Sequence, residues 1–176
     1  MKSHSKLIPT HLVPHFRSNH AGETGAVFIY KAILKFSNDR DVLNFAKKHL
    51  KTEQNHLKEI CKVLDENDNS KLLMLWKIFG YMTGLVPSLI GKKFIFTTIY
   101  YVEKFVEKHY LEQINILEND KEHLHLHKLI KNLMNDEVEH KNEAYDKFND
   151  FGVLTKIWGI IIMQGSSLAV KISKRF

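Results

Sequence analysis

Six residues in this chain, four glutamates and two histidines, have types and spacing that indicate metal chemistry. Residues three apart on a helix lie on adjacent turns of one face, so both side chains of a Glu-x-x-His pair can reach one ion. Two such pairs, each following a lone glutamate in the preceding predicted helix, match the ligand set of ferritin-like di-iron or di-manganese proteins. The six candidates are Glu23, Glu53, His56, Glu103, Glu137 and His140.

Each of the four glutamates interrupts an apolar helical stripe that would otherwise be core. An unpaired buried carboxylate costs several kcal/mol or becomes neutral. Four of them in one core therefore need cations, and two divalent ions carry the balancing charge. For one stripe alone, glutamates paired with surface lysines explain the pattern equally well, whereas the four stripes together favour metal. Carboxylate and imidazole ligands suit iron or manganese, and ligand type alone does not exclude zinc.

Other residues of the same types fail this comparison. Glu122/His125 is a third Glu-x-x-His pair, but no matching pair lies at its level along the predicted bundle, so we expect it to be solvated. The alternating histidines of residues 123–127 point about 200° apart on a helix and cannot converge on one ion. Glu107, one turn after Glu103, is ambiguous because it faces either the site or a neighbouring lysine.

The hydrophobic pattern predicts helices and no strands. Apolar residues recur at helical spacing, and no useful stretch alternates with period two. We therefore expect an all-α fold, a ferritin-like four-helix bundle built from two similar hairpins, with additional apolar helices at a membrane interface. The predicted helices span about residues 18–36, 39–66, 93–118, 121–148 and 155–173, and glycines and a proline interrupt the apolar segment 72–89.

The composition indicates one globular domain. The chain has 176 residues, 44% hydrophobic, with a formal net charge of +6. We expect an N-terminal arm over residues 1–17 and a single di-iron helical domain over residues 18–176. The arm has no apolar run, so it is not a secretory signal. The single cysteine, Cys61, excludes a disulfide framework within one chain and is expected to be buried.

Two apolar segments favour contact with a membrane surface. The uncharged runs 78–91 and 157–170 are shorter than the span that a bilayer requires. Lysines flank both runs, and Trp76 and Trp158 stand near their boundaries, as in helices that lie at a lipid interface. A bundle core or a self-association face is the alternative. Positive charge beside apolar segments, without a nucleic-acid motif, favours a membrane over nucleic acid.

The order and spacing of these motifs resemble the demethoxyubiquinone hydroxylases of ubiquinone biosynthesis. The resemblance covers the chain from about Phe16 to Phe176. It depends on the segments His20-Ala21-Gly22-Glu23-Thr24-Gly25-Ala26, Glu53-Gln54-Asn55-His56-Leu57, Val102-Glu103 through His109-Tyr110, and Asp136-Glu137-Val138-Glu139-His140. Asn19, before the first motif, stands where this family usually has aspartate.

This resemblance implies a di-iron monooxygenase that hydroxylates a demethoxylated, prenylated quinone ring with O2 and reducing equivalents. Two iron ions per chain are implied, one held by Glu23, Glu53 and His56 and the other by Glu103, Glu137 and His140, with Glu53 and Glu137 bridging. His109 and Tyr110 match a pair that lines the family's site, although core packing explains them equally well.

The resemblance also implies a place in the cell and partners. It implies a peripheral protein on the cytoplasmic face of a bacterial inner membrane, or on the matrix face of the mitochondrial inner membrane. A lipid-binding accessory protein and homo-oligomerisation are both compatible with it. Two other functions stay open, a ferritin-like or rubrerythrin-like protein that handles iron or peroxide, and a metal-free helical membrane adaptor.

Overall fold

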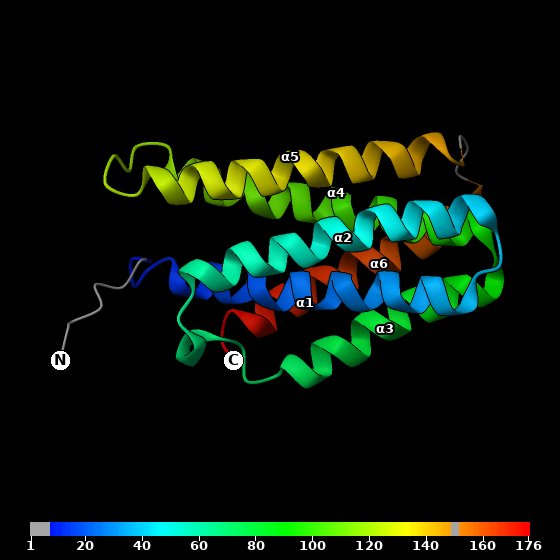
Figure 1. The fold of residues 1–176 in the computed structure, drawn as a ribbon, viewed down its shortest axis with the longest axis horizontal. Coiled ribbons are helices and arrows are strands. Elements are labelled where there is room, and N and C mark those ends of the chain that lie inside the picture. The colour runs from blue at the N-terminus through cyan, green and yellow to red at the C-terminus, as the bar shows by residue number, and fades with distance from the viewer. Residues whose placement is uncertain (1–7, 149–151) are drawn as a thin grey trace.

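The computed structural model describes residues 8–148 and 152–176, and these residues are helical throughout, without a strand. This confirms the predicted all-α class. Six α-helices and one short 3-10 helix run in the order shown in Figure 1. Their bounds are α1 Val13–Phe36, α2 Arg40–Val63, the 3-10 helix η1 Glu66–Asp68, α3 Leu73–Ile90, α4 Lys92–Leu117, α5 Leu124–Asp146 and α6 Val153–Ser173.

Four of the helices form the predicted bundle of two hairpins. Helix α1 packs against α2, α4 packs against α5, and α2 contacts α5 where the hairpins meet. Helix α3 packs along α1, whereas α6 contacts both α4 and α1. In Figure 1, α3 follows the lower edge of the molecule and α6 passes behind α1. The two additional helices thus cover the α1 and α4 side of the bundle.

The first helix begins five residues before the predicted start. Pro14 lies in its first turn, where the backbone N–H that proline lacks would have no helical partner. Ile8, Leu12 and Phe16 are buried in the core. The division into an arm (1–17) and a domain (18–176) stays a prediction. The expectation that Cys61 is buried is wrong, since it lies on the exposed side of α2.

Helix α3 is continuous through the glycines that were expected to interrupt it. A Cβ atom on Gly80 would overlap the backbone oxygen of Gly25, and one on Gly84 would overlap the backbone oxygen of Ile29. These glycines therefore let α3 approach the backbone of α1 closely. Pro87 lies in the last turn of α3, and Gly91, with φ of 138°, joins α3 directly to α4.

Both tryptophans face the protein, although they were expected to mark a lipid interface. Trp76 is buried, and its indole N–H donates to Ser70 Oγ over 2.9 Å. The indole of Trp158 donates to Thr98 Oγ1 over 2.7 Å. The first hydrogen bond ties α3 to the loop before it, and the second ties α6 to α4. These two indoles therefore give no support to contact with lipid.

The core is divided into two apolar clusters. One contains residues from the N-terminal part of α1, the C-terminal parts of α2 and α4, and the first half of α5. The other contains the C-terminal half of α1, the beginnings of α2 and α4, and the end of α5. On each of these four helices, the predicted ligands lie between the two clusters. The bundle therefore places its polar residues at mid-length, away from the helix ends.

Candidate metal centre and adjoining cavity

The structure brings the six predicted ligands together as two groups with shared members. In each group the ligand atoms lie within 4.8 Å of one another, and every residue is buried. Glu53 and Glu137 belong to both groups, as bridging carboxylates would. The groups are Glu23, Glu53, His56 and Glu137, and Glu53, Glu103, Glu137 and His140.

The two histidines face the cluster through the same ring atom. His56 Nδ1 lies 3.1 Å from Glu137 Oε1 and 3.5 Å from Glu23 Oε2. His140 Nδ1 lies 3.0 Å from oxygens of both Glu53 and Glu137. Each imidazole nitrogen is therefore surrounded by carboxylate oxygens from different helices, which is the arrangement that ions at the centre would require.

Several buried atoms of this cluster have no hydrogen-bond partner among the described residues. They include both oxygens of Glu53, one oxygen each of Glu23 and Glu137, and Nδ1 of His140, which is close to oxygens but outside hydrogen-bond geometry. Buried polar atoms are nearly always paired in folded proteins. A converging set of unpaired carboxylate oxygens and imidazole nitrogens fits a pair of divalent cations, so the residues present can hold the metals that the sequence predicts.

The charges of the cluster give a second reason for cations. Burial, followed by the nearby Glu137 carboxylate, raises the pKa of Glu53 to about 8. The same two causes raise the pKa of Glu103 well above its ordinary value. Burial alone would lower the pKa of His140, but the carboxylates of Glu137 and Glu53 raise it to about 10. Without metal, the cluster therefore retains protons that metal ions would displace on binding.

Two neighbouring side chains position the ligands. The Tyr110 hydroxyl donates to Glu23 Oε1, so this predicted residue touches a ligand directly. The second ring nitrogen of His56, Nε2, lies 3.0 Å from Asp136 Oδ2. Carboxylates commonly fix metal-bound histidines in this way. Sequence reasoning missed the role of Asp136, although its position directly before Glu137 offered a signal.

His109 belongs to a separate buried group, which we call the His109 network and define as His109, Ser18, Asn19 and Gln113. His109 Nε2 lies 3.1 Å from Ser18 Oγ and 3.0 Å from Asn19 Oδ1. The Ser18 hydroxyl donates to the His15 carbonyl, so both neighbours accept a hydrogen bond from the ring N–H. Asn19 and Gln113 exchange two hydrogen bonds of 2.7 and 2.9 Å. Burial lowers the pKa of His109 to about 3, so the ring is neutral.

The other candidate residues, Glu122, His125 and Glu107, lie outside the cluster. Glu122 and His125 are exposed, as expected for a solvated pair. Glu107 forms an ion pair with Lys141 and belongs to neither ligand group. The structure also brings His49 beside the centre, a residue that the sequence did not single out. Its ring lies 4.0 Å from that of His140, and Nε2 is 3.0 Å from Glu143 Oε2.

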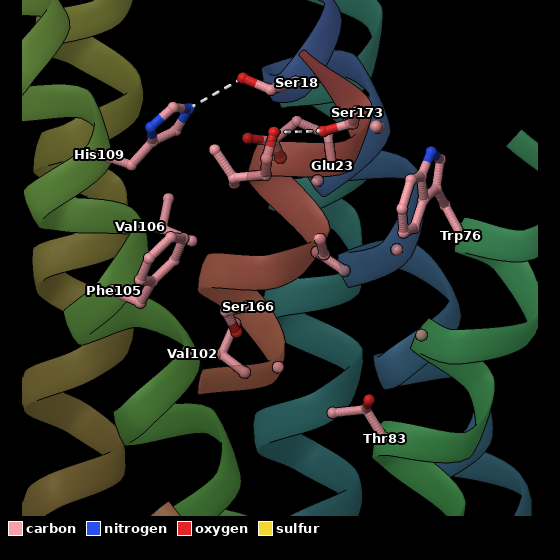
Figure 2. A pocket seen from close by; sticks show the side chains of 18 of the residues that line it. Ser18, Glu23, Trp76, Thr83, Val102, Phe105, Val106, His109, Ser166 and Ser173 are labelled. Atoms are coloured by element: carbon pink, nitrogen blue, oxygen red, sulfur yellow. Dashed lines mark hydrogen bonds between the residues drawn. The ribbon is translucent and has the colours of Figure 1, made fainter. Parts of the chain in front are cut away.

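A cavity of about 460 Å³ adjoins the carboxylates. Helices α1, α3, α4 and α6 form its walls, and Glu23, Glu53, Glu103 and Glu137 reach it from within the bundle. Most of the remaining lining is apolar. Figure 2 shows Glu23 and the His109–Ser18 hydrogen bond towards one end, with Ser166 and Thr83 towards the other. A mainly apolar cavity with a few convergent polar groups is typical of a small-molecule site.

The cavity opens between the two additional helices. Phe79 of α3 and Ile161 and Leu168 of α6 line it and are also more than half exposed, at 56%, 57% and 58%. These helices carry most of the exposed large apolar side chains. Unlike the shorter uncharged runs within them, the whole helices are long and apolar enough to cross a membrane, by length and composition alone. The route from the surface to the carboxylates therefore begins on an apolar face.

Comparison with known proteins identifies the family of this chain. The family model described as ubiquinone biosynthesis protein COQ7 matches residues 10–173. The chain is 29% identical to the mouse (Mus musculus) NADPH-dependent 3-demethoxyubiquinone 3-hydroxylase over 91% of its own length and 76% of that protein. It is 28% identical to the 3-demethoxyubiquinol 3-hydroxylase of Rhodospirillum rubrum, over 95% and 80% of the two chains. This chain belongs to the COQ7 family of ubiquinone biosynthesis proteins.

Proposed function

We propose that this protein is a di-iron monooxygenase that hydroxylates the ring of a demethoxylated, prenylated ubiquinone precursor. One observation carries the proposal: two overlapping ligand groups of buried glutamate and histidine border an apolar cavity that opens on an apolar surface. The relatives named as 3-demethoxyubiquinone or 3-demethoxyubiquinol 3-hydroxylases support this substrate class.

Each ligand has a proposed position. Glu23, Glu53 and His56 would hold one iron, and Glu103, Glu137 and His140 would hold the other. Glu53 and Glu137 would bridge, because both belong to the two ligand groups. When bound, the two ions supply the redox chemistry that activates O2. Two divalent ions balance the charges of the four carboxylates and leave both histidines neutral.

The chain's own residues prepare the site for this reaction. Tyr110 holds Glu23 through its hydroxyl, and Asp136 fixes the ring of His56. The apolar walls exclude bulk water and orient an aromatic ring beside the carboxylates. In the overall reaction one oxygen atom enters a ring C–H bond and the other leaves as water, which consumes two electrons and two protons from a reductant. His109 and Tyr110 line the cavity, so both would face a bound substrate.

Access from a membrane surface follows from the exposed apolar residues of α3 and α6. These helices lie along the bundle, so their exposed sides form a face that would rest on lipid, and a prenylated quinone would enter there. This favours a peripheral protein at the cytoplasmic face of a bacterial inner membrane or the matrix face of the mitochondrial one. A lipid-binding accessory protein and a homo-oligomer would both bury part of this face.

A hydroxylation assay tests the proposed function. The full chain is loaded with Fe(II) under anaerobic conditions, then given O2, a reductant and a demethoxylated quinol. We expect a product heavier by one oxygen atom, and we expect Glu53→Ala and His140→Ala to abolish it. Retention of iron and hydroxylation by both variants would refute the ligand assignment.

The second candidate is a ferritin-like or rubrerythrin-like protein for iron or peroxide. The same ligand groups are compatible with it, but it gives no role to the apolar cavity or to the exposed faces of α3 and α6. Liposome flotation separates the two functions. A hydroxylase of lipid-borne quinones floats with the vesicles, whereas a soluble iron-storage protein stays in the lower fraction.

A further inference from the structure

Gly165 occupies an unusual position on the cavity wall. It lies on α6 one turn from Ile161 and one turn from Leu168, two residues at the mouth of the cavity, and it lines the cavity itself. A Cβ atom at Gly165 would meet no other heavy atom within 4 Å. Gly159, also on α6, differs, because a Cβ there would overlap the ring of Tyr101. Packing therefore requires glycine at 159 but not at 165.

Helix stability does not explain Gly165 either. Glycine in a helix interior is less favourable than alanine, since it loses more backbone freedom on folding. Gly165 is exposed, so the missing side chain leaves open space where α6 borders the mouth of the cavity. At 1.5 Å per residue, the α6 stripe from Ile161 to Ser173 extends about 18 Å along the cavity. Glu23, buried and with one unpaired oxygen, lines the same cavity, and Figure 2 draws it towards the same end of the cavity as Ser173.

We propose that Gly165 sets the width of the passage through which the isoprenoid tail of the substrate extends from the inner site to the apolar face. With the aromatic ring beside the carboxylates, the tail would lie against α6 at Gly165 and leave between Phe79 and Leu168. Gly165 is then a specificity-determining residue. A larger side chain there excludes tailed quinones but still admits a ring without a tail.

The cavity contains its own reporter of binding. Trp76 lines it, and the ring of a bound quinone should quench the fluorescence of this indole. Trp158, the other tryptophan, is hydrogen-bonded to Thr98 and is not among the residues that line the cavity. The Trp76→Phe variant should therefore lose the quenching signal and identifies its source.

The test compares Gly165→Val with Gln164→Val in the purified full chain. Gln164 is adjacent on α6, exposed, and outside the cavity lining, so both variants add valine to the same helix. In a titration with a quinone that carries several isoprene units, Gly165→Val should bind at least about tenfold more weakly than the wild type, which is the scale of a steric mismatch in an apolar pocket. The tail-less quinone should bind as in the wild type. Gln164→Val should leave both affinities unchanged.

A Gly165→Ala variant guards against misfolding as the cause. It should unfold at the same or a higher temperature than the wild type and still bind the tailed quinone more weakly. Equal losses for tailed and tail-less quinones, or no loss for either, would overturn the proposal. Since the proposal rests on the proposed function, hydroxylation is assayed separately. Binding with tail discrimination but without hydroxylation refutes the function alone, and hydroxylation without tail discrimination refutes the role of Gly165 alone.

Discussion

Two buried polar groups, the His109 network and the glutamate–histidine cluster, differ in how their hydrogen bonds are satisfied. In the His109 network, Asn19 and Gln113 pair through both amides, and the ring N–H has acceptors. In the glutamate–histidine cluster, oxygens of three carboxylates have no partner among the described residues. Both groups are equally buried, so burial alone does not distinguish a structural network from a site. What distinguishes the site is that its unpaired, potentially metal-ligating atoms converge.

The largest expected effect is on metal affinity, which should depend on the glutamate–histidine cluster and not on the His109 network. Glu137→Ala removes a residue that both ligand groups of the cluster share, so we expect it to abolish binding of both ions. Equilibrium dialysis against Fe(II) measures this loss. Asp136→Asn should weaken affinity by about 10–100-fold, as is typical of residues that support a ligand.

Gln113→Ala is the matched control from the His109 network. It should leave the metal content of the protein unchanged, because no atom of Gln113 belongs to a ligand group. If Gln113→Ala lost metal as completely as Glu137→Ala, the distinction between the two groups would be wrong.

A charge exchange should change stability in opposite directions in the metal-free protein. Burial and the adjacent Glu137 carboxylate raise the pKa of Glu103 well above its ordinary value, so folding of the metal-free chain favours the protonated, neutral form of this side chain. Glu103→Gln keeps the side chain neutral without a bound proton and should stabilise the metal-free chain at pH 7. The gain should vanish below the ordinary glutamate pKa of 4.5, where the unfolded chain is also protonated.

Gln113→Glu is the reverse exchange, in the satisfied network. It removes the amide donors to Asn19 and to the His109 carbonyl, and it adds a buried charge. We expect it to destabilise the protein by about 3–5 kcal/mol. Urea unfolding at both pH values measures each variant, and a loss of stability for Glu103→Gln would contradict the account of the cluster.

Acidification should reveal the neutral histidine of the network. Burial depresses the pKa of His109 from 6.5 to about 3, so the unfolded chain binds a proton in this range and the folded chain does not. Stability contributed at this position is therefore present above pH 6.5 and is lost as the pH falls. Between pH 6.5 and 5 the wild type should lose about 2 kcal/mol more than His109→Gln. Identical slopes for the two proteins would show that His109 is protonated when folded.

The smallest effect is expected at the exposed pair Glu122/His125. Glu122→Ala with His125→Ala changes two exposed residues and should alter stability by no more than about 0.5 kcal/mol. Metal content should be unchanged. Loss of one ion in this double variant would place a ligand outside the cluster.

The sequence predicted which residues form the buried glutamate–histidine cluster, because periodicity determines helix faces. The stripes around Glu53 and Glu137 identified positions that must be buried, and the solvated state of Glu122/His125 followed from the same comparison. The role of the glycines in α3 was not predictable in this way. Gly80 and Gly84 were interpreted as breaks, because only the packed structure places the α1 backbone against them.

Side-chain contacts that have no periodic signal in the sequence explain the other differences. The hydrogen bonds of Trp76 and Trp158 link residues in α3 and α6 to loop and α4 hydroxyls, and the sequence carries no periodic signal for them. The same holds for His49, whose acidic partner Glu143 and ring neighbour His140 lie about 90 residues further along the chain. The His109 network likewise joins α1 to α4 across the bundle.

The stoichiometry of the wild-type protein tests the central claim most directly. Metal-free full chain is titrated with Fe(II) under anaerobic conditions, and bound and free iron are separated and counted. Two ligand groups that share Glu53 and Glu137 predict saturation at two ions per chain. Saturation at one ion, many ions or none would contradict the two-metal centre.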